Sequence, residues 1–583
     1  MIRRTVALYV VFASLLLACS RPGRPAANGS ATPGPPVEGD WVIIRYDTEP
    51  ENLNPLMQQT ANAGYALYGV NFSQIAETLM QYNTENWTIT KPLLAESVPE
   101  VSADHLTYTY TVRDGVKWHD GRPFTPEDVL FSAKAAMCPL VDAAVLRSTV
   151  TDLVNVEVLE GRKVRFTMSR PYYLNEVQLG TFYIAPKHIF DPNGVLDKYS
   201  FKDMIGPKGR TDPKIKQFAQ EFNKHPNNRS PIGTGPYKFE KWETGKQIVL
   251  TRNADYWGTK PYLDKLVIRI IQDQPAALTA LKAGEVDFNP RLLPIQYAQQ
   301  TSGAAFDQQF TKTKYNYPSF YYIGWNADRP YFKDKRVRRA LTMLIDRQQL
   351  IDSVRFGLAK IAASHFTPDS YAFNPNVKPL PYDPKAAMQL LDEAGWTDHD
   401  GDGIRDKDGV PFRFEFVGGA NSVFVDQLLS VVKEEFRKAG IDMEERRLEF
   451  TVLVDSLKDH RFDAASGAWA SDLFSDPFQL WHSSQAENRG SNFVSFKNAE
   501  ADKLIEQART EFDQEKRKQL YWRFQEIIQD EQPYTFLFYP QETAAYQKRF
   551  QNVVWMPNRP SYDLNSWFVQ KAAQKYSAAT SVQ

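Results

Sequence analysis

Apolar residues recur at every second position in several short stretches of the chain. In the segment LTYTYTV, residues 106–112, leucine, tyrosine and valine alternate with threonine. A period of two residues places the apolar side chains on one face of an extended backbone. The segment therefore predicts a half-buried strand, and two alternating runs around Glu160-Gly161 predict a β-hairpin.

Other stretches carry apolar residues at helical spacing, bounded by residues that begin and end helices. Thr125-Pro126 opens one helix, because threonine caps the first turn and proline fits the first helical position. Asp383-Pro384 opens a second that ends at Gly395, and the segment 421–440 predicts a third. Asp513 is the expected N-cap of a fourth.

Strands and helices alternate over most of the 583 residues, without internal repeats. A chain of this length forms two or more domains of ordinary size. The sequence thus predicts an α/β protein of at least two lobes. The polar stretch 195–230, rich in lysine and proline, is expected to be a surface loop.

The N-terminal segment has the pattern of a bacterial export signal. Two arginines precede an apolar run at residues 5–18, which is too short to span a bilayer, and Ala18 precedes Cys19. This ending resembles the bacterial lipobox, in which cleavage occurs before a cysteine that is then lipidated. We expect a lipoprotein signal peptide at 1–18, a lipid on Cys19 and a flexible tether at 19–40. An ordinary signal peptide is the alternative.

Charge and composition exclude several classes of function. The net charge of −1, with no basic stretch, argues against a nucleic-acid partner. There is no His-Glu-x-x-His zinc motif, no Gly-x-Ser-x-Gly segment and no Walker loop, and the 8 histidines are scattered, so we expect no enzyme activity. The 12 Trp, 28 Tyr and 36 Phe residues are numerous enough to line a cleft as well as to fill cores.

One segment is similar to a calcium loop. In TDHDGDGIRDKDGVPF, residues 397–412, positions one, three, five and nine of such a loop are Asp398, Asp400, Asp402 and Asp406. Position twelve, where calcium loops carry a glutamate, is Gly409. Two interpretations therefore stand: a structural Ca²⁺ site on these aspartates, or metal-free Asp-Gly turns. Apart from this loop the sequence predicts no cofactor.

A longer segment, YTVRDGVKWHDGRPFTPEDVLFS at residues 110–132, resembles the hallmark segment of the family 5 extracellular solute-binding proteins. Further similar segments follow in family order, among them SPIGTGPYKF, YWGTKPYLDKLVIRII, YYIGWNADRPYFKDKRVRRALTMLIDR and YDPKAAMQLLDEAGW. The resemblance covers nearly all of residues 41–570. Members of that family deliver dipeptides, oligopeptides, nickel and some sugars to ABC importers, so the resemblance implies a binding protein.

The resemblance also implies an architecture. The family has a two-lobed periplasmic binding protein fold of the large class II type, with a hinge between the lobes and an extra subdomain in lobe I. Lobe I is expected at 41–315, with residues 536–575 returning to it, and lobe II at 316–535. The ligand would be enclosed between the lobes.

The resemblance further points to individual residues. Peptide-binding members hold the ligand's α-ammonium group with an aspartate three residues after a tryptophan, and AWASDLFSDPF, residues 468–478, matches with Trp469 and Asp472. Asp472 is the predicted ammonium partner, and Trp469 is either a wall of the site or a core residue. Ser466 replaces an arginine of some relatives, which leaves Arg489 as a candidate cation for a ligand carboxylate. Further predicted contacts, at family positions near the cleft, are Trp325, Asn326 and Asn492.

These observations predict a substrate-binding lipoprotein of an ABC importer. It would be exported and anchored through Cys19 to the bacterial cell envelope, on the periplasmic side or the outer cell surface. Its expected partners are di- or oligopeptides and the ABC permease and ATPase subunits, and the chain is expected to be a monomer. Two alternatives stay open: the same role for an oligosaccharide, an opine or a nickel complex, and a surface signalling or adhesion lipoprotein that lost transport.

Overall fold

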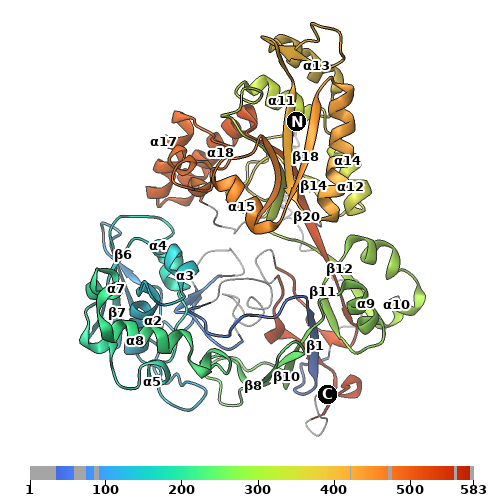
Figure 1. Cartoon of the computed structure of the whole chain (residues 1–583). Coiled ribbons are helices and arrows are strands. Elements are labelled where there is room, and N and C mark those ends of the chain that lie inside the picture. Colours follow the sequence, from blue (N-terminus) through green and yellow to red (C-terminus); the bar gives the residue numbers. More distant parts are fainter. Residues whose placement is uncertain are drawn as a thin grey trace, which may run out of the picture.

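The computed structural model describes residues 34–57, 74–83, 91–420, 422–470, 474, 476–556 and 561–577. These residues form two lobes, one above the other in Figure 1. The lower lobe contains the first half of the chain and the C-terminal segment, and the upper lobe contains the residues between them. The predicted two-lobed α/β class is therefore confirmed, whereas the predicted signal peptide and Cys19 lie outside the described residues.

Lobe I is built on a sheet whose central strands are parallel. β1 (Trp41–Tyr46) pairs in parallel with β10 (Lys265–Ile270) and with β11 (Phe288–Leu292). β9 (Gln247–Arg252) and β8 (Tyr237–Glu243) extend the sheet with antiparallel pairing. β1 is buried along its full length, as expected of a strand covered on both faces.

An extra subdomain occupies the left of lobe I in Figure 1. Its four-stranded antiparallel sheet has the order β4 (Glu100–Val101), β5 (Thr107–Thr111), β7 (Lys163–Met168) and β6 (Leu153–Leu159). The predicted strand and hairpin are thus confirmed. The predicted helix after Thr125 is also present, as α2 (Pro126–Met137), and the backbone N–H of Thr125 donates to Asp128 at 2.9 Å.

The stretch 195–230 is not the surface loop that its composition indicated. It contains α6 (Phe201–Ile205), α7 (Lys208–Thr211) and α8 (Pro213–Asn223). The exposed lysines of α8 face outward, while an apolar stripe at helical spacing packs into the core of the subdomain, through Ile215, Phe218, Ala219 and Phe222. The expected loop was wrong because it rested on the polar composition and overlooked the helical spacing of these apolar residues.

Lobe II has its own α/β core on the other half of the sheet. Its strands lie in the order β13 (Ser319–Trp325), β19 (Ala464–Ala470), β17 (Arg413–Gly419) and β18 (Asp442–Leu448). β17 is parallel to both β18 and β19. The predicted helices are present as α13 (Pro384–Glu393), α14 (Val423–Lys438) and α18 (Gln514–Glu531), and their neighbours include α11 (Lys335–Met343), α12 (Arg347–Arg355), α15 (Phe450–Lys458) and α17 (Ala499–Thr510).

One long strand, β20 (Tyr534–Gln547), belongs to both lobes. Its first half pairs with β13 and with β14 (Ala359–Ile361) in lobe II, and its second half pairs with β11 and with β12 (Phe310–Asn316) in lobe I. The chain crosses between the lobes at 316–319 and again near Pro540. The predicted boundary at 535/536 therefore falls inside β20, a few residues before the crossing.

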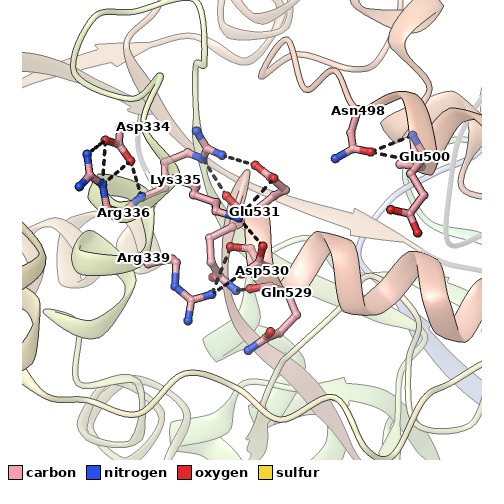
Figure 2. Close-up of polar contacts among 12 residues, drawn as sticks. Asp334, Lys335, Arg336, Arg339, Asn498, Glu500, Gln529, Asp530 and Glu531 are labelled. Carbon is pink, nitrogen blue, oxygen red and sulfur yellow. Dashed lines mark hydrogen bonds and ion pairs between the residues drawn. The ribbon is translucent and has the colours of Figure 1, made fainter. Parts of the chain in front are cut away.

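The start of β20 is held by charged side chains of α11 and α18. Figure 2 shows Lys335 and Arg339 beside Asp530 and Glu531. Both side chains donate to the Asp530 carboxylate, Lys335 Nζ at 2.5 Å and an Arg339 guanidinium nitrogen at 3.2 Å. The buried guanidinium of Arg338 lies 3.0 Å from the Glu531 carboxylate and also donates to its carbonyl oxygen at 2.9 Å. Because α18 ends at Glu531 and β20 begins at Tyr534, these contacts fix the strand at its lobe II end.

Within the part of the chain that the structure describes, we find no helix with the length and apolar character needed to cross a membrane.

Candidate functional site

A cavity of about 370 Å³ lies between the extra subdomain and lobe II. The wall from the subdomain is mostly polar and includes Ser148, Thr149, Thr151, Asp152, Arg170 and Gln178. The wall from lobe II is rich in rings and includes Phe320, His365, Trp469, Phe474 and Phe478. The cavity thus presents polar groups on one side and aromatic rings on the other, which suits a ligand with both polar and apolar parts.

Beside this cavity the two lobes touch through side chains and one backbone hydrogen bond. We call this contact the clasp; it is formed by Tyr172 and Tyr173 of the subdomain and by Asp476, Arg509 and Arg517 of lobe II. The Tyr172 hydroxyl donates to the Asp476 carboxylate at 2.7 Å, and Arg509 Nε lies 3.0 Å from the same oxygen. The Arg509 guanidinium also lies over the Tyr172 ring, 4.7 Å from its centroid. Burial, and then the charge of Asp476, raise the pKa of Tyr172 well above its ordinary value, so this hydroxyl keeps its proton.

The second tyrosine of the clasp, Tyr173, is enclosed by lobe II. Its backbone N–H donates to the carbonyl oxygen of Arg509 at 3.0 Å, and the Tyr521 hydroxyl donates to its hydroxyl at 3.2 Å. The Arg517 guanidinium stacks 4.0 Å from its ring centroid. Both tyrosines are buried, so the structure shows the lobes closed on this side.

His365 lies in the cavity wall, on the segment that follows β14. It is buried, and burial lowers the pKa of its imidazole to about 3. The ring is therefore neutral at pH 7. Its neighbours include the rings of Phe366 and Trp481, at 4.1 and 5.8 Å between centroids.

The predicted site residues divide into several groups. Trp469 lines the cavity, where it stacks on Phe493 at 5.6 Å and its indole N–H lies 3.4 Å from the Tyr534 hydroxyl. Asp472, the predicted ammonium partner, lies outside the described residues. The next described carboxylate along the chain is Asp476, which lines the same cavity and holds the clasp.

Three predicted contacts lie in the core of lobe II instead of in the cavity wall. Trp325 donates to the Thr535 hydroxyl at 3.0 Å. The Asn326 amide donates to the Phe462 carbonyl oxygen at 2.8 Å, and the Asn492 amide donates to that of Phe496 at 2.8 Å. All three side chains are fully buried; the two asparagines hold backbone carbonyl groups, and Trp325 holds a side-chain hydroxyl of β20.

The predicted cation is also placed away from the cavity. Arg489 lies on the surface of lobe II and forms ion pairs with Asp455 and Asp459. It does not line the cavity. Ser466, which replaces the arginine of some relatives, is buried in β19.

The aspartate loop lies in lobe II, between α13 and β17. Carboxylate oxygens of Asp398, Asp400 and Asp406 lie within 4.8 Å of one another, while Asp402 is not part of this group. Asp398 accepts hydrogen bonds from the backbone N–H groups of Gly401 and Gly403 at 2.8 and 3.1 Å. These are the bonds of tight turns, which such a loop forms with or without a metal.

The sequence reasoning did not find the clasp. The two adjacent tyrosines in RPYYL come shortly after β7. Two large rings side by side in a loop are a weak signal that another part of the chain covers them. Its partners, Asp476, Arg509 and Arg517, lie more than 300 positions later in the chain. Only the closed arrangement of the lobes brings these residues together.

Comparisons with known proteins agree with this architecture. The family model of the bacterial extracellular solute-binding proteins, family 5 (middle region), matches residues 90–491. The chain belongs to this family. The oligopeptide-binding protein AppA of Bacillus subtilis (strain 168) is 31% identical over 573 residues, which cover 97% of this chain and 98% of that protein. The nickel-binding periplasmic protein of Escherichia coli (strain K12) is 27% identical over 423 residues, 71% of this chain and 72% of that protein.

Solved structures show the same fold. The oligopeptide-binding protein AppA from Bacillus subtilis, in complex with a nonapeptide, superposes with a TM-score of 0.70 at 30% identity and covers 92% of this chain and 100% of that one. NikZ from Campylobacter jejuni, in complex with Ni(L-His), superposes with a TM-score of 0.69 at 26% identity and covers 91% of this chain and 99% of that one. The resemblance stated from the sequence is thus confirmed. The family is one of extracellular binding proteins, and nothing in the comparisons indicates catalysis.

Proposed function

We propose that this protein is the substrate-binding component of an ABC importer and that it captures di- or oligopeptides between its lobes. The observation that carries the proposal is the relative of 31% identity along 97% of the chain, which is an oligopeptide-binding protein. A related structure holds a nonapeptide. The cavity between subdomain and lobe II, beside the tryptophan of the Trp-x-x-Asp pattern, is consistent with a ligand enclosed by both lobes.

The architecture supports capture by closure. β20 provides a continuous hinge, and a ligand that touches both lobes stabilises the closed state over the open one. Backbone pairing to an extended peptide does not depend on side chains, so such a site accepts many sequences. Asp472 remains our proposed partner for the ligand's α-ammonium group, because a carboxylate forms a strong charge-assisted hydrogen bond with it.

A nickel complex is the second candidate, because nickel-binding relatives cover much of the chain. Among the described residues, the group of His, Cys, Asp and Glu side chains placed to hold a metal is Asp398, Asp400 and Asp406, and none of these lines the cavity. Peptide is therefore the better-supported ligand.

We also propose that the protein is tethered to a membrane through lipid on Cys19, as the Ala18-Cys19 ending indicates. Mass spectrometry of the N-terminal fragment from cells should show a diacylglyceryl cysteine at this position. Cys19→Ser should release the protein from the membrane fraction. A mature chain that begins elsewhere and carries no lipid would contradict the proposal.

The peptide assignment can be tested with purified protein freed of ligand by partial unfolding and refolding. We expect a pool of short peptides to raise its melting temperature, and native mass spectrometry to identify bound peptides. Ni(L-His) is the matched alternative ligand in the same assay. Stabilisation by the nickel complex, with no response to any peptide pool, would overturn the assignment.

A further inference from the structure

The chain leaves large apolar side chains exposed on the lobe II edge that faces lobe I. β17, β18 and β19 are parallel, so their C-terminal ends share one edge. This edge faces lobe I, because the end of β19 pairs with the start of β13 just after the chain crosses between lobes, and Trp469 lines the interlobe cavity there. The carboxyl edge of such strands is the usual location of ligands in α/β proteins.

Three residues on this edge are the most exposed large apolar side chains of the described chain. They are Phe450, Val423 and Val452, whose exposed fractions are 73%, 69% and 53%. Val423 is the first residue of α14, after β17, and Phe450 is the first of α15, after β18. Helix starts are normally polar, and exposing a phenylalanine to this extent forgoes the free energy of its burial.

Contacts with the hinge fix the position of this surface. Phe424, the neighbour of Val423, packs against Tyr321 on β13 and Phe538 on β20, at 4.9 and 5.7 Å between ring centroids. Val423 therefore lies on the hinge side of the cleft, whereas the clasp lies on the subdomain side. The space between hinge and clasp is the space that our proposed function assigns to the ligand.

Lobe I contributes exposed apolar residues on its facing edge. β11 is parallel to β1, and its C-terminal residue, Leu292, is paired with Thr543 on the part of β20 nearest the crossing. The Thr543 hydroxyl donates to the Leu292 carbonyl oxygen at 2.9 Å. Directly after this point come Leu293 and Ile295, which are 40% and 39% exposed.

We infer that these five residues, Leu293, Ile295, Val423, Phe450 and Val452, form an apolar binding surface for hydrophobic side chains of the bound peptide. We call it the hinge-side apolar surface. Exposed apolar residues follow strand ends in both lobes, so a ligand that touches both with large apolar residues would lose solvent-exposed area against each lobe. The inference rests on the proposed function, and it adds that the preferred peptides are apolar.

The test uses two pentapeptides that differ only in having three leucines or three serines at the central positions. For the wild-type protein, calorimetry should show the leucine peptide binding about tenfold more tightly, with a more negative heat-capacity change. In the triple variant Val423→Ser, Phe450→Ser and Val452→Ser, this preference should disappear while the affinity for the serine peptide is kept. These side chains are exposed, so the variant should fold, and Val410→Ser, at an exposed site on the aspartate-loop hairpin, is the matched control.

Each other outcome overturns the inference. Equal affinity of the wild type for the two peptides, or a preference that survives in the triple variant, would show that the surface does not contact ligand side chains. If the variant bound both peptides normally but no longer stimulated the reconstituted transporter, the surface would be a docking face for the permease. If a broad peptide pool binds and these two peptides do not, the inference fails alone. If the pool also fails to bind, the proposed function fails with it.

Discussion

Two of the places where the lobes meet, the hinge and the clasp, differ in kind. At the hinge, β20 runs unbroken through both lobes and is held by backbone pairing with β13 on one side and β12 on the other. At the clasp, Tyr172 and Tyr173 reach lobe II mainly through side-chain bonds and ring contacts, with a single backbone hydrogen bond from Tyr173 to Arg509. A paired strand can bend but cannot separate without local unfolding, whereas side-chain contacts can part and leave both lobes folded. Changes at the hinge should therefore lower stability, and changes at the clasp should alter opening.

The largest effect is expected in the part of the lobe II core that anchors the hinge strand β20, from Trp325→Ala. This side chain is fully buried on β13 and bonded to Thr535 on β20, so its removal leaves a large cavity beside the strand. We expect the free energy of unfolding to fall by about 3–5 kcal/mol in urea denaturation. Trp325→Phe, which keeps a ring and loses the hydrogen bond, is the control and should cost about 1 kcal/mol. Normal stability combined with lost ligand binding would make Trp325 a contact residue after all.

The next largest effect is a pH dependence of the unfolding free energy, which we expect from His365 in the cavity wall. Burial holds its pKa at about 3, below the value of 6.5 for an unfolded chain, so the unfolded state takes up a proton first as pH falls. The stability that His365 contributes is present above pH 6.5 and is lost as the pH falls toward 3. Between pH 7 and pH 5 the loss amounts to about 2 kcal/mol.

The variant His365→Phe isolates this contribution from that of His119, whose pKa burial lowers to about 4. Over the interval from pH 7 to pH 5, the variant should lose about 2 kcal/mol less unfolding free energy than the wild type. An identical pH dependence of the two proteins would show that His365 is protonated, or reaches water, in the folded state.

Removing the clasp should give a smaller change in free energy, visible in binding. In Tyr172→Ala/Tyr173→Ala the closed state loses the hydroxyl and ring contacts of both tyrosines, while the backbone bond from residue 173 to Arg509 can remain, so the apparent affinity for peptide should fall about tenfold. The urea midpoint should shift much less than in Trp325→Ala. Tyr199→Ala, in the same subdomain, is the matched control and should bind normally. A double variant that unfolds, or one that binds like the wild type, would mean that the clasp does not govern opening.

The smallest effect is expected from removing divalent metal. Asp398 already accepts two backbone N–H groups, and we propose that the loop holds its shape through such turns. EDTA should then leave the melting temperature unchanged, and 1–5 mM CaCl₂ should raise it by less than about 1 °C, because binding stabilises only when the concentration exceeds the dissociation constant. A rise of several degrees, lost in Asp400→Asn, would establish a calcium site.

The sequence determined much of the fold because the relevant signals are local. Alternation in LTYTYTV, the Thr125 cap and the Asp513 cap each depend on a few adjacent residues, and each element appears where it was predicted. The prediction of a surface loop at 195–230 was wrong because it relied on the polar composition of the stretch. Its apolar residues, from Ile215 to Phe222, recur with helical period.

The site was harder to predict because it depends on contacts between distant segments. The family pattern directed attention to Trp469, which lines the cavity, whereas Trp325, Asn326 and Asn492 are buried in the core of lobe II. Tyr173 and Arg517 carry no shared motif, and their contact exists only when the lobes are closed. No pattern along the chain reports which exposed side chains will face each other across a cleft.

The most direct test of closure between hinge and clasp is single-molecule fluorescence transfer across the cleft. Dyes would be placed at Lys198→Cys in the subdomain and Lys503→Cys on α17, both exposed positions, in a Cys19→Ser background where Cys138 is buried. Without ligand the wild-type protein should exchange between closed molecules with high transfer efficiency and open molecules with low transfer efficiency. Peptide should shift the population to high transfer efficiency. Tyr172→Ala/Tyr173→Ala should move the ligand-free protein to low transfer. A distribution that neither peptide nor loss of the clasp alters would contradict the account.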